Sequence, residues 1–408
     1  MMNLFIVNLI LIISGLIVHT VKSQPDISVQ KDLINIPGLI WKYSSSQPFF
    51  SSPVIKDDKI FIGGDDSIFR ALDLKNGNTL WEIKTNGSIR STPLLVNDII
   101  YLNGGDGVLY SVNSDGKIIW KIKAGEEEKY DFADYHQSSP VFLNNTIFFG
   151  LGDGFVYAVD PEYGDIKWKY QTGGVVHSSP AVDDSSLFIG SFDGFVYALN
   201  ISDGSLIWKF KTIGHKYFPI GEVQGSPSIS GDLIFIGARD YNFYAVDRDK
   251  GYCHWNKVFK KGWVLTSMIN DTALYLEGAD ERILSAVNPQ TGKEFWKRDM
   301  EFLMFGRPAF SKSMLYTGTT IGKLHALDKL TGNEVWTFST DGYKNNRLKY
   351  FKENDSYRDD IYSIIKSNEH FLEVEMELGG IFSTPAIANE YLVFTSTEGS
   401  VYCLKSMK

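Results

Sequence analysis

Cysteine and histidine are scarce in this chain of 408 residues, which contains two cysteines and seven histidines. Neither Cys253 nor Cys403 has a second cysteine or a histidine at metal-ligand or haem-attachment spacing. The two fall in different sequence repeats, described below, so we expect two free, buried thiols. No Ser/His/Asp arrangement, phosphate-binding loop or zinc motif is present either, and the sequence offers no catalytic residue and no metal site.

Positive charge is also in short supply. Lys and Arg number 40 against 49 Asp and Glu, which gives a formal net charge of −9, and no basic run occurs. A surface that binds phosphate backbones needs clustered Lys and Arg. We therefore expect no nucleic-acid partner.

Long apolar runs are absent except at the N-terminus, where one extends from Leu4 to Val18. It is followed by Val21-Lys22-Ser23-Gln24, with small or β-branched residues at the −3 and −1 places of a cleavage site. We predict that residues 1–23 are a cleaved signal peptide and that the protein is exported, to a periplasmic or extracellular location. A retained membrane anchor is the alternative. After cleavage no transmembrane span is expected.

What the chain has in abundance is a repeat. The motif Ala71-Leu72-Asp73-x-x-Asn76-Gly77-x-x-x-Trp81 recurs along the sequence at intervals of about 40 to 48 residues, a propeller-blade period. Its copies end at Trp81, Trp120, Trp168, Trp208, Trp255, Trp296 and Trp336. One tryptophan at a fixed place in each repeat indicates a structural residue that docks neighbouring blades.

Each period predicts four short strands, because β-branched and aromatic runs alternate with Gly- and Asp-containing turns. In the fourth repeat the expected strands A to D are 177–182, 186–190, 195–199 and 206–210. An eighth unit, 382–402, has strands A to C but no tryptophan. Residues 39–43, which include Trp41, supply the missing strand D. We predict an all-β, eight-bladed propeller over 39–408, closed by this N-terminal strand.

Acidic residues recur at one turn of most repeats, and we interpret them as structural. An Asp at such a turn hydrogen-bonds its own backbone. The turn residues are Asp66, Asp106, Asp153, Asp193, Asp240 and Asp280.

The repeat resembles the PQQ-like (quinoprotein-type) propeller repeat. The resemblance rests on the Ala-x-Asp-x-x-Thr-Gly-x-x-x-Trp docking motif, best kept at 326–336, and on the run from Ser178 to Leu199. It covers residues 39–408 and is most similar to stand-alone, BamB-like exported propellers. The quinone-dependent dehydrogenases that share the repeat bind PQQ with calcium, and alcohol-oxidising members have adjacent, bonded cysteines, which this chain lacks. PQQ with calcium is possible but unsupported, and no cofactor is expected.

The long connections between repeats all join strand D to the next strand A. They are 124–136, 212–223 and 339–380, so they should lie on one face, and 359–377 has helical periodicity. Long loops on one face of a repeat protein commonly carry its binding function. A disordered surface loop is the alternative for the last one.

The residue three before the strand A proline, or its equivalent, divides the ring into two halves. Blades two to five have Arg90, Gln137, His177 and Gln224, whereas blades six, seven, eight and one have Leu265, Phe305, Phe382 and Phe50. We expect a channel mouth with one polar and one apolar half, and Trp263 at the apolar edge. A ligand site there is the hypothesis; packing between blades is the alternative.

Three functions remain open. The first is a non-catalytic, monomeric binding or scaffold propeller that engages a protein or cell-envelope partner through the loop-rich face. The second is a PQQ- and calcium-dependent alcohol or sugar dehydrogenase, and the third is recognition of an extracellular glycan.

Overall fold

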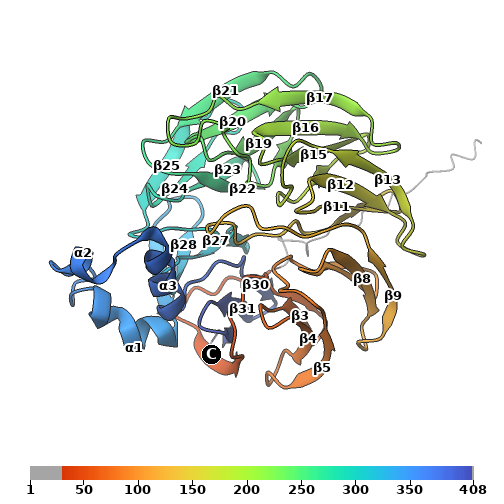
Figure 1. The fold of residues 1–408 in the computed structure, drawn as a ribbon. Helices are drawn as coiled ribbons and strands as arrows, with labels where there is room; N and C mark the ends of the chain where they lie inside the picture. Colours follow the sequence, from red (N-terminus) through yellow and green to blue (C-terminus); the bar gives the residue numbers. More distant parts are fainter. Residues whose placement is uncertain (1–29, 407–408) are drawn as a thin grey trace, which may run out of the picture.

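The computed structural model describes residues 30–406, apart from the side chains of Leu265 and Thr266. The predicted signal peptide, residues 1–23, lies outside the described residues. Eight separate four-stranded antiparallel sheets form a ring, as the sequence predicts (Figure 1). No helix in the described part of the chain is long and apolar enough to cross a membrane.

Blades one to four contain four strands each, in chain order. They are β2 (Val54–Lys56), β3 (Lys59–Gly63), β4 (Ile68–Asp73) and β5 (Thr79–Lys84); β6 (Leu94–Val96), β7 (Ile99–Asn103), β8 (Val108–Asn113) and β9 (Ile118–Lys123); β10 (Val141–Leu143), β11 (Thr146–Gly150), β12 (Phe155–Val159) and β13 (Ile166–Gln171); and β14 (Ala181–Val182), β15 (Ser186–Gly190), β16 (Phe195–Asn200) and β17 (Leu206–Lys211).

Blades five to seven repeat this order, and blade eight takes its fourth strand from the N-terminus. They are β18 (Ser228–Ser230), β19 (Leu233–Gly237), β20 (Asn242–Asp247) and β21 (Cys253–Val258); β22 (Val264–Asn270), β23 (Ala273–Gly278), β24 (Ile283–Val287) and β25 (Glu294–Asp299); β26 (Ala309–Phe310), β27 (Met314–Gly318), β28 (Lys323–Asp328) and β29 (Glu334–Ser339); and β30 (Ala386–Ala388), β31 (Tyr391–Ser396), β32 (Ser400–Lys405) and β1 (Gly38–Ser44).

The repeated tryptophans dock each blade onto the next. Each indole N–H donates to a backbone carbonyl of the following blade or, for Trp336, of the N-terminal segment. From Trp41 to Trp336 the acceptors are Leu74, Ser114, Pro161, Ile201, Arg248, Pro289, Lys329 and Leu33, at 2.6 to 3.1 Å. The glycine of the motif packs against the indole of the preceding blade. Gly77 has φ 74°, and a Cβ atom there would lie 2.6 Å from the Trp41 indole. Each of these indoles thus joins two neighbouring parts of the ring.

Closure of the ring needs more of the N-terminus than the predicted strand. β1 pairs with β32, as expected. In addition, the fully buried Leu33 gives its carbonyl to Trp336 and its N–H to the Tyr316 hydroxyl, at 2.9 Å. Asp32 accepts hydrogen bonds from Ser311 Oγ and from the N–H and Oγ of Ser313, at 2.6 to 2.8 Å. Residues 32–33 thus take the place of the C–D turn that blade eight lacks, because its strand D comes from the N-terminus.

Two local expectations need correction. Strand A of blade four is only Ala181–Val182 rather than 177–182, because the backbone N–H of Ser179 donates to Ser226 Oγ of the next blade instead of to a sheet partner. Cys253 is free but exposed, since it lies on the outer strand β21; Cys403 is free and buried, as expected.

Five of the six turn acids bond their own turns. Oδ1 of Asp66, Asp106, Asp153, Asp193 and Asp240 accepts from the backbone N–H two residues later, at 3.0 to 3.1 Å. Asp280 makes no such bond within residues 30–406.

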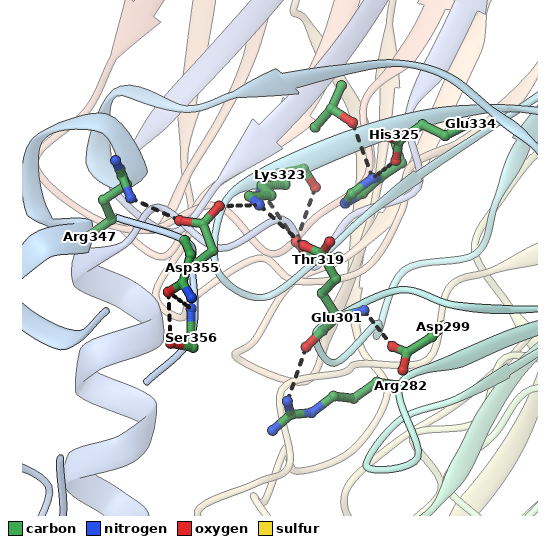
Figure 2. A network of polar contacts seen from close by, with 12 residues as sticks. Arg282, Asp299, Glu301, Thr319, Lys323, His325, Glu334, Arg347, Asp355 and Ser356 are labelled. Carbon is green, nitrogen blue, oxygen red and sulfur yellow. Dashed lines mark hydrogen bonds and ion pairs between the residues drawn. The ribbon is translucent and has the colours of Figure 1, made fainter. Parts of the chain in front are cut away.

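The last D–A connection is folded. It contains α1 (Asp341–Tyr350), α2 (Ile361–Ile364) and α3 (Asn368–Glu377). The periodicity of 359–377 predicted α2 and α3, whereas α1 was not predicted. Figure 2 shows how polar contacts tie the segment to the ring: Lys323 of β28 contacts Asp355 at 2.9 Å, and Asp355 contacts Arg347 of α1 at 2.9 Å.

Candidate functional site

A cavity of about 310 Å³ occupies the central channel. Its walls are the strand A segments of the blades, which supply both a hydroxyl-rich belt and apolar side chains. Four of the five predicted mouth residues, Arg90, Gln137, His177 and Gln224, lie in this wall, and so do the apolar Phe50, Phe305 and Phe382. The two-sided ring expected from the sequence is therefore brought together around one space. The side chain of Leu265 lies outside the described residues.

The mouth on the loop-rich face is filled by the chain itself. Residues 124–136, which we call the plug loop, lead from β9 into β10, and Figure 1 shows this gold segment running across the middle of the ring. Tyr135 of the plug loop is 3% exposed. Its ring stacks on Phe50 at 5.2 Å and meets Phe382 edge-on at 5.3 Å. The apolar half of the mouth thus holds the aromatic end of the plug loop.

His177 holds the polar side of the plug loop. Its Nδ1 lies 2.7 Å from Asp134 Oδ2, and its Nε2 lies 3.1 Å from Glu127 Oε1 in an ion-pair contact too poorly aligned for a hydrogen bond. Burial favours a neutral imidazole, but the two carboxylates outweigh it and raise the pKa of His177 to about 9. Burial likewise opposes ionisation of Asp134, but the hydrogen bond and charge of His177, a hydrogen bond from the Tyr130 backbone N–H and the charge of Arg239 together lower the pKa of that carboxyl.

Arg239 binds a second acid of the plug loop, and Gln224 positions Arg239. Arg239, 1% exposed, forms an ion pair with Asp131 and donates from Nε to Gln224 Oε1 at 3.0 Å. The guanidinium also lies over the ring of Trp263, 4.2 Å from its centroid. Trp263 therefore stands beside the aromatic cluster of the mouth, as expected, but it contacts a cation of the polar half as well.

Arg90 and Gln137 form contacts between blades and do not bind the plug loop. Arg90 forms a two-pronged ion pair with Asp65, at 2.9 and 2.7 Å, and its backbone N–H donates to Gln137 Oε1. Gln137 Nε2 donates to the Ser88 carbonyl at 3.0 Å. All five predicted site residues therefore lie at or beside the mouth, but there they bind the plug loop or a neighbouring blade.

Several residues of the site were not predicted from the sequence. The sequence did not identify Glu127, Asp131 and Asp134, because the partner of a loop carboxylate is known only from the folded structure. Arg307 did carry a signal: it stands directly before the strand A proline of its blade, where most other blades have Ser or Thr. Arg239 also carried one, since the corresponding residue of blade four is Phe192.

The mouth is a poor match for a quinone with calcium. A calcium ion takes six to eight oxygen ligands, several of them from carboxylates. In residues 30–406 no group of three or more His, Cys, Asp or Glu is placed to hold a metal ion. Three carboxylates of the plug loop, Glu127, Asp131 and Asp134, are each paired with His177 or Arg239. We therefore derive no chemical step through that cofactor.

Comparisons with known proteins place the chain among propellers of this type. The profile of the family described as outer membrane protein assembly factor BamB matches residues 37–209, 105–273 and 279–348. No curated protein sequence matches the chain.

Similar solved structures include BamB from Moraxella catarrhalis (TM-score 0.66, 14% identity, covering 91% of this chain and 100% of that chain). The quinohemoprotein alcohol dehydrogenase of Comamonas testosteroni is similar as well (TM-score 0.67, 14% identity, 90% and 76%). So is the computationally designed protein Ika8 (TM-score 0.65, 14% identity, 89% and 97%). At these identities the likeness concerns the fold alone.

Proposed function

The chain belongs to the family of outer membrane protein assembly factor BamB, and we propose that it is a non-catalytic, exported propeller that binds a protein of the cell envelope through its loop-rich face. The family description supports an envelope partner. The N-terminal apolar run and the cleavage pattern at 21–24 support export. The filled channel mouth supports a binding role over turnover at that place.

The observation that carries the proposal is an apolar surface on two neighbouring D–A loops. The plug loop exposes Tyr130 (39%) and Phe132 (45%), and the 212–223 loop exposes Ile213 (71%), Tyr217 (65%) and Ile220 (44%). The loops are joined, because the Tyr130 hydroxyl donates to Glu222 at 3.1 Å. We call these five side chains the loop patch. Large apolar side chains clustered on loops, with tyrosine among them, are typical of protein interfaces.

The loop patch rests on a rigid base, which favours binding without a large ordering cost. Tyr130 packs on Phe192 with ring centroids 4.4 Å apart, and Phe218 meets Trp263 edge-on at 5.3 Å. Arg239 lies beneath, in contact with Tyr130, Phe192 and Trp263. A preorganised surface loses less conformational entropy when a partner docks.

The test compares two triple variants of the full chain. In the first, Phe132→Ser, Ile213→Ser and Tyr217→Ser remove the centre of the loop patch. In the matched control, Ile119→Ser, Ile207→Ser and Val258→Ser remove side chains of similar exposure (49%, 46% and 68%) from outer strands. Loss of a central apolar contact costs on the order of 2 kcal/mol. We expect recovery of partners from envelope extract to fall at least ten-fold for the first variant and to persist for the control.

Equal recovery by both variants would contradict the proposal. Two further measurements separate the other functions. Reduction of a dye on addition of PQQ, calcium and an alcohol or sugar would assign dehydrogenase activity. Saturable binding of an oligosaccharide that the first variant abolishes would assign the loop patch to glycans.

A further inference from the structure

A belt of hydroxyl groups surrounds the cavity below the plug loop, and all of them are hydrogen-bond donors. Oγ of Ser139, Ser179 and Ser226 each accepts a backbone N–H from the preceding blade, and so do the hydroxyls of Thr384 and Ser52, at 2.9 to 3.1 Å. Each oxygen has thereby used an acceptor site and keeps its proton for donation. No acceptor for these five protons is found within residues 30–406, and all five side chains line the cavity.

Blade seven breaks this belt with a cation. Arg307 occupies the place before the strand A proline and also lines the cavity. Its Nη2 donates to the carbonyls of Ser226 and Pro227 in blade five, at 2.9 and 3.4 Å. The described residues offer no partner for Nε–H or for the Nη1 protons. Three donors of a planar guanidinium therefore remain available toward the cavity.

The charge of Arg307 is only weakly balanced. No carboxylate forms an ion pair with it in the described part of the chain, in contrast to Arg90 and Arg239 in the same channel. Burial lowers the pKa of the guanidinium, and the charge of Glu277 only partly opposes this. Burial lowers the pKa of the nearby His136 to about 4, so this imidazole is neutral and adds no second positive charge to the site. A cation that faces a cavity without an ion-pair partner is costly, and an incoming anion would lower that cost.

Apolar side chains line both ends of the cavity. Phe305 and Phe382 lie at the plug end, and Ile55, Leu94 and Phe310 lie toward the A–B turns at the other end. At the plug end Tyr135, Phe305 and Phe382 are buried, whereas Val54 and Ile55 near the A–B turns are partly exposed. A volume of about 310 Å³ is in the range of small-ligand pockets.

We propose that the channel below the plug loop binds a small carboxylate with an apolar body, which enters from the A–B face, pairs with Arg307 and accepts hydrogen bonds from the hydroxyl belt. A guanidinium matches a carboxylate through two parallel hydrogen bonds. The belt offers the carboxylate five O–H groups that have no acceptor in the described residues. This site goes beyond the proposed function and does not depend on it, because the loop patch lies on the opposite face.

The experiment measures binding of benzoate and hexanoate to the full chain by calorimetry, beside the neutral analogues benzamide and hexanol. Arg307→Ser gives blade seven the residue found at this place in most blades, and Arg358→Gln, in the exposed insertion, is the matched control. We expect saturable binding of at least one carboxylate to wild type and to Arg358→Gln, and affinity at least ten-fold lower for Arg307→Ser. Arg307→Gln, which keeps a donor without charge, replaces the serine variant if that variant does not fold.

Three results would each overturn the proposal. They are no saturable binding of either carboxylate at millimolar concentration, equal binding of the neutral analogues, and unchanged affinity in the variants that lack the Arg307 charge. The comparison of carboxylates with neutral analogues uses wild-type protein alone, so it stands even if every variant is unstable. Partner recovery by the loop patch is measured separately, so the two proposals can fail independently.

Discussion

Replacing His177 by glutamine should loosen the plug loop and remove its pH dependence. In the wild type a protonated imidazole lies between Asp134 and Glu127, whose side chains are 0% and 7% exposed. Glutamine can donate to one of these carboxylates but carries no charge. Two buried carboxylates would then lie together without the cation that balances them, which is a costly arrangement.

The magnitude follows from the pKa of His177, which the fold raises from the ordinary 6.5 to about 9. Because the folded-state pKa is the higher one, the stabilisation is fully present below pH 6.5 and is lost as the pH rises through 9. A difference of one pKa unit corresponds to about 1.4 kcal/mol, so the whole change is about 3 kcal/mol. Wild-type plug stability should therefore fall by about this amount between pH 6 and pH 10, and the variant should show little change.

Hydrogen exchange of residues 126–136, corrected for the intrinsic pH dependence of exchange, measures the opening free energy directly. His254→Gln is the matched control, because that histidine also faces a carboxylate, Asp247 at 3.3 Å, but is 40% exposed. If His177→Gln retains the wild-type pH dependence of exchange, or if His254→Gln loses it, the assignment of the plug anchor to His177 is refuted.

Three further perturbations test the frame and the insertion. Asp32→Ala removes three hydrogen bonds of the closing segment and should lower the free energy of unfolding in urea by about 1–3 kcal/mol, whereas the exposed Asp184→Ala should not; equal effects would contradict closure by residues 32–33. Trp168→Phe removes one blade-to-blade hydrogen bond, at 2.9 Å, and should cost about 1–2 kcal/mol in the same assay; an unchanged unfolding midpoint would argue against docking. Burial raises the pKa of Glu375 in α3 to about 8, so this acid binds a proton on folding between pH 4.5 and 8 and the protein loses stability as the pH rises through that window. Glu375→Gln should thus exceed wild type in thermal stability at pH 8 and approach it at pH 5, and a variant less stable at both pH values would contradict this.

The frame could be predicted from the sequence because each blade repeats the same local rules. The indole of Trp81, the glycine before it and the alternating strands all lie within one repeat, so comparing the copies identifies each of them. Closure was predicted from Trp41, but the contribution of Leu33 was not, since its partner Trp336 lies 303 residues away and the segment resembles no repeat.

The location of the site could be predicted from the sequence, but the contacts that its residues make could not. The division of the mouth into a polar and an apolar half follows from the register of residues such as His177 and Phe382, and the structure brings them together. That the plug loop occupies the mouth depends on Tyr135 and Asp134 reaching across the ring, and such contacts leave no periodic signal. Arg307 departs from the repeat in a way that the sequence does show.

The most direct test of the proposed function is photo-crosslinking of the protein in its native envelope. A photoreactive amino acid replaces Tyr217 in the loop patch or, in a separate protein, the exposed Ile207 of strand β17. We expect a crosslink to a discrete envelope protein from position 217 and none from position 207. Crosslinks from 207 alone, or identical products from both positions, would contradict binding through the loop-rich face.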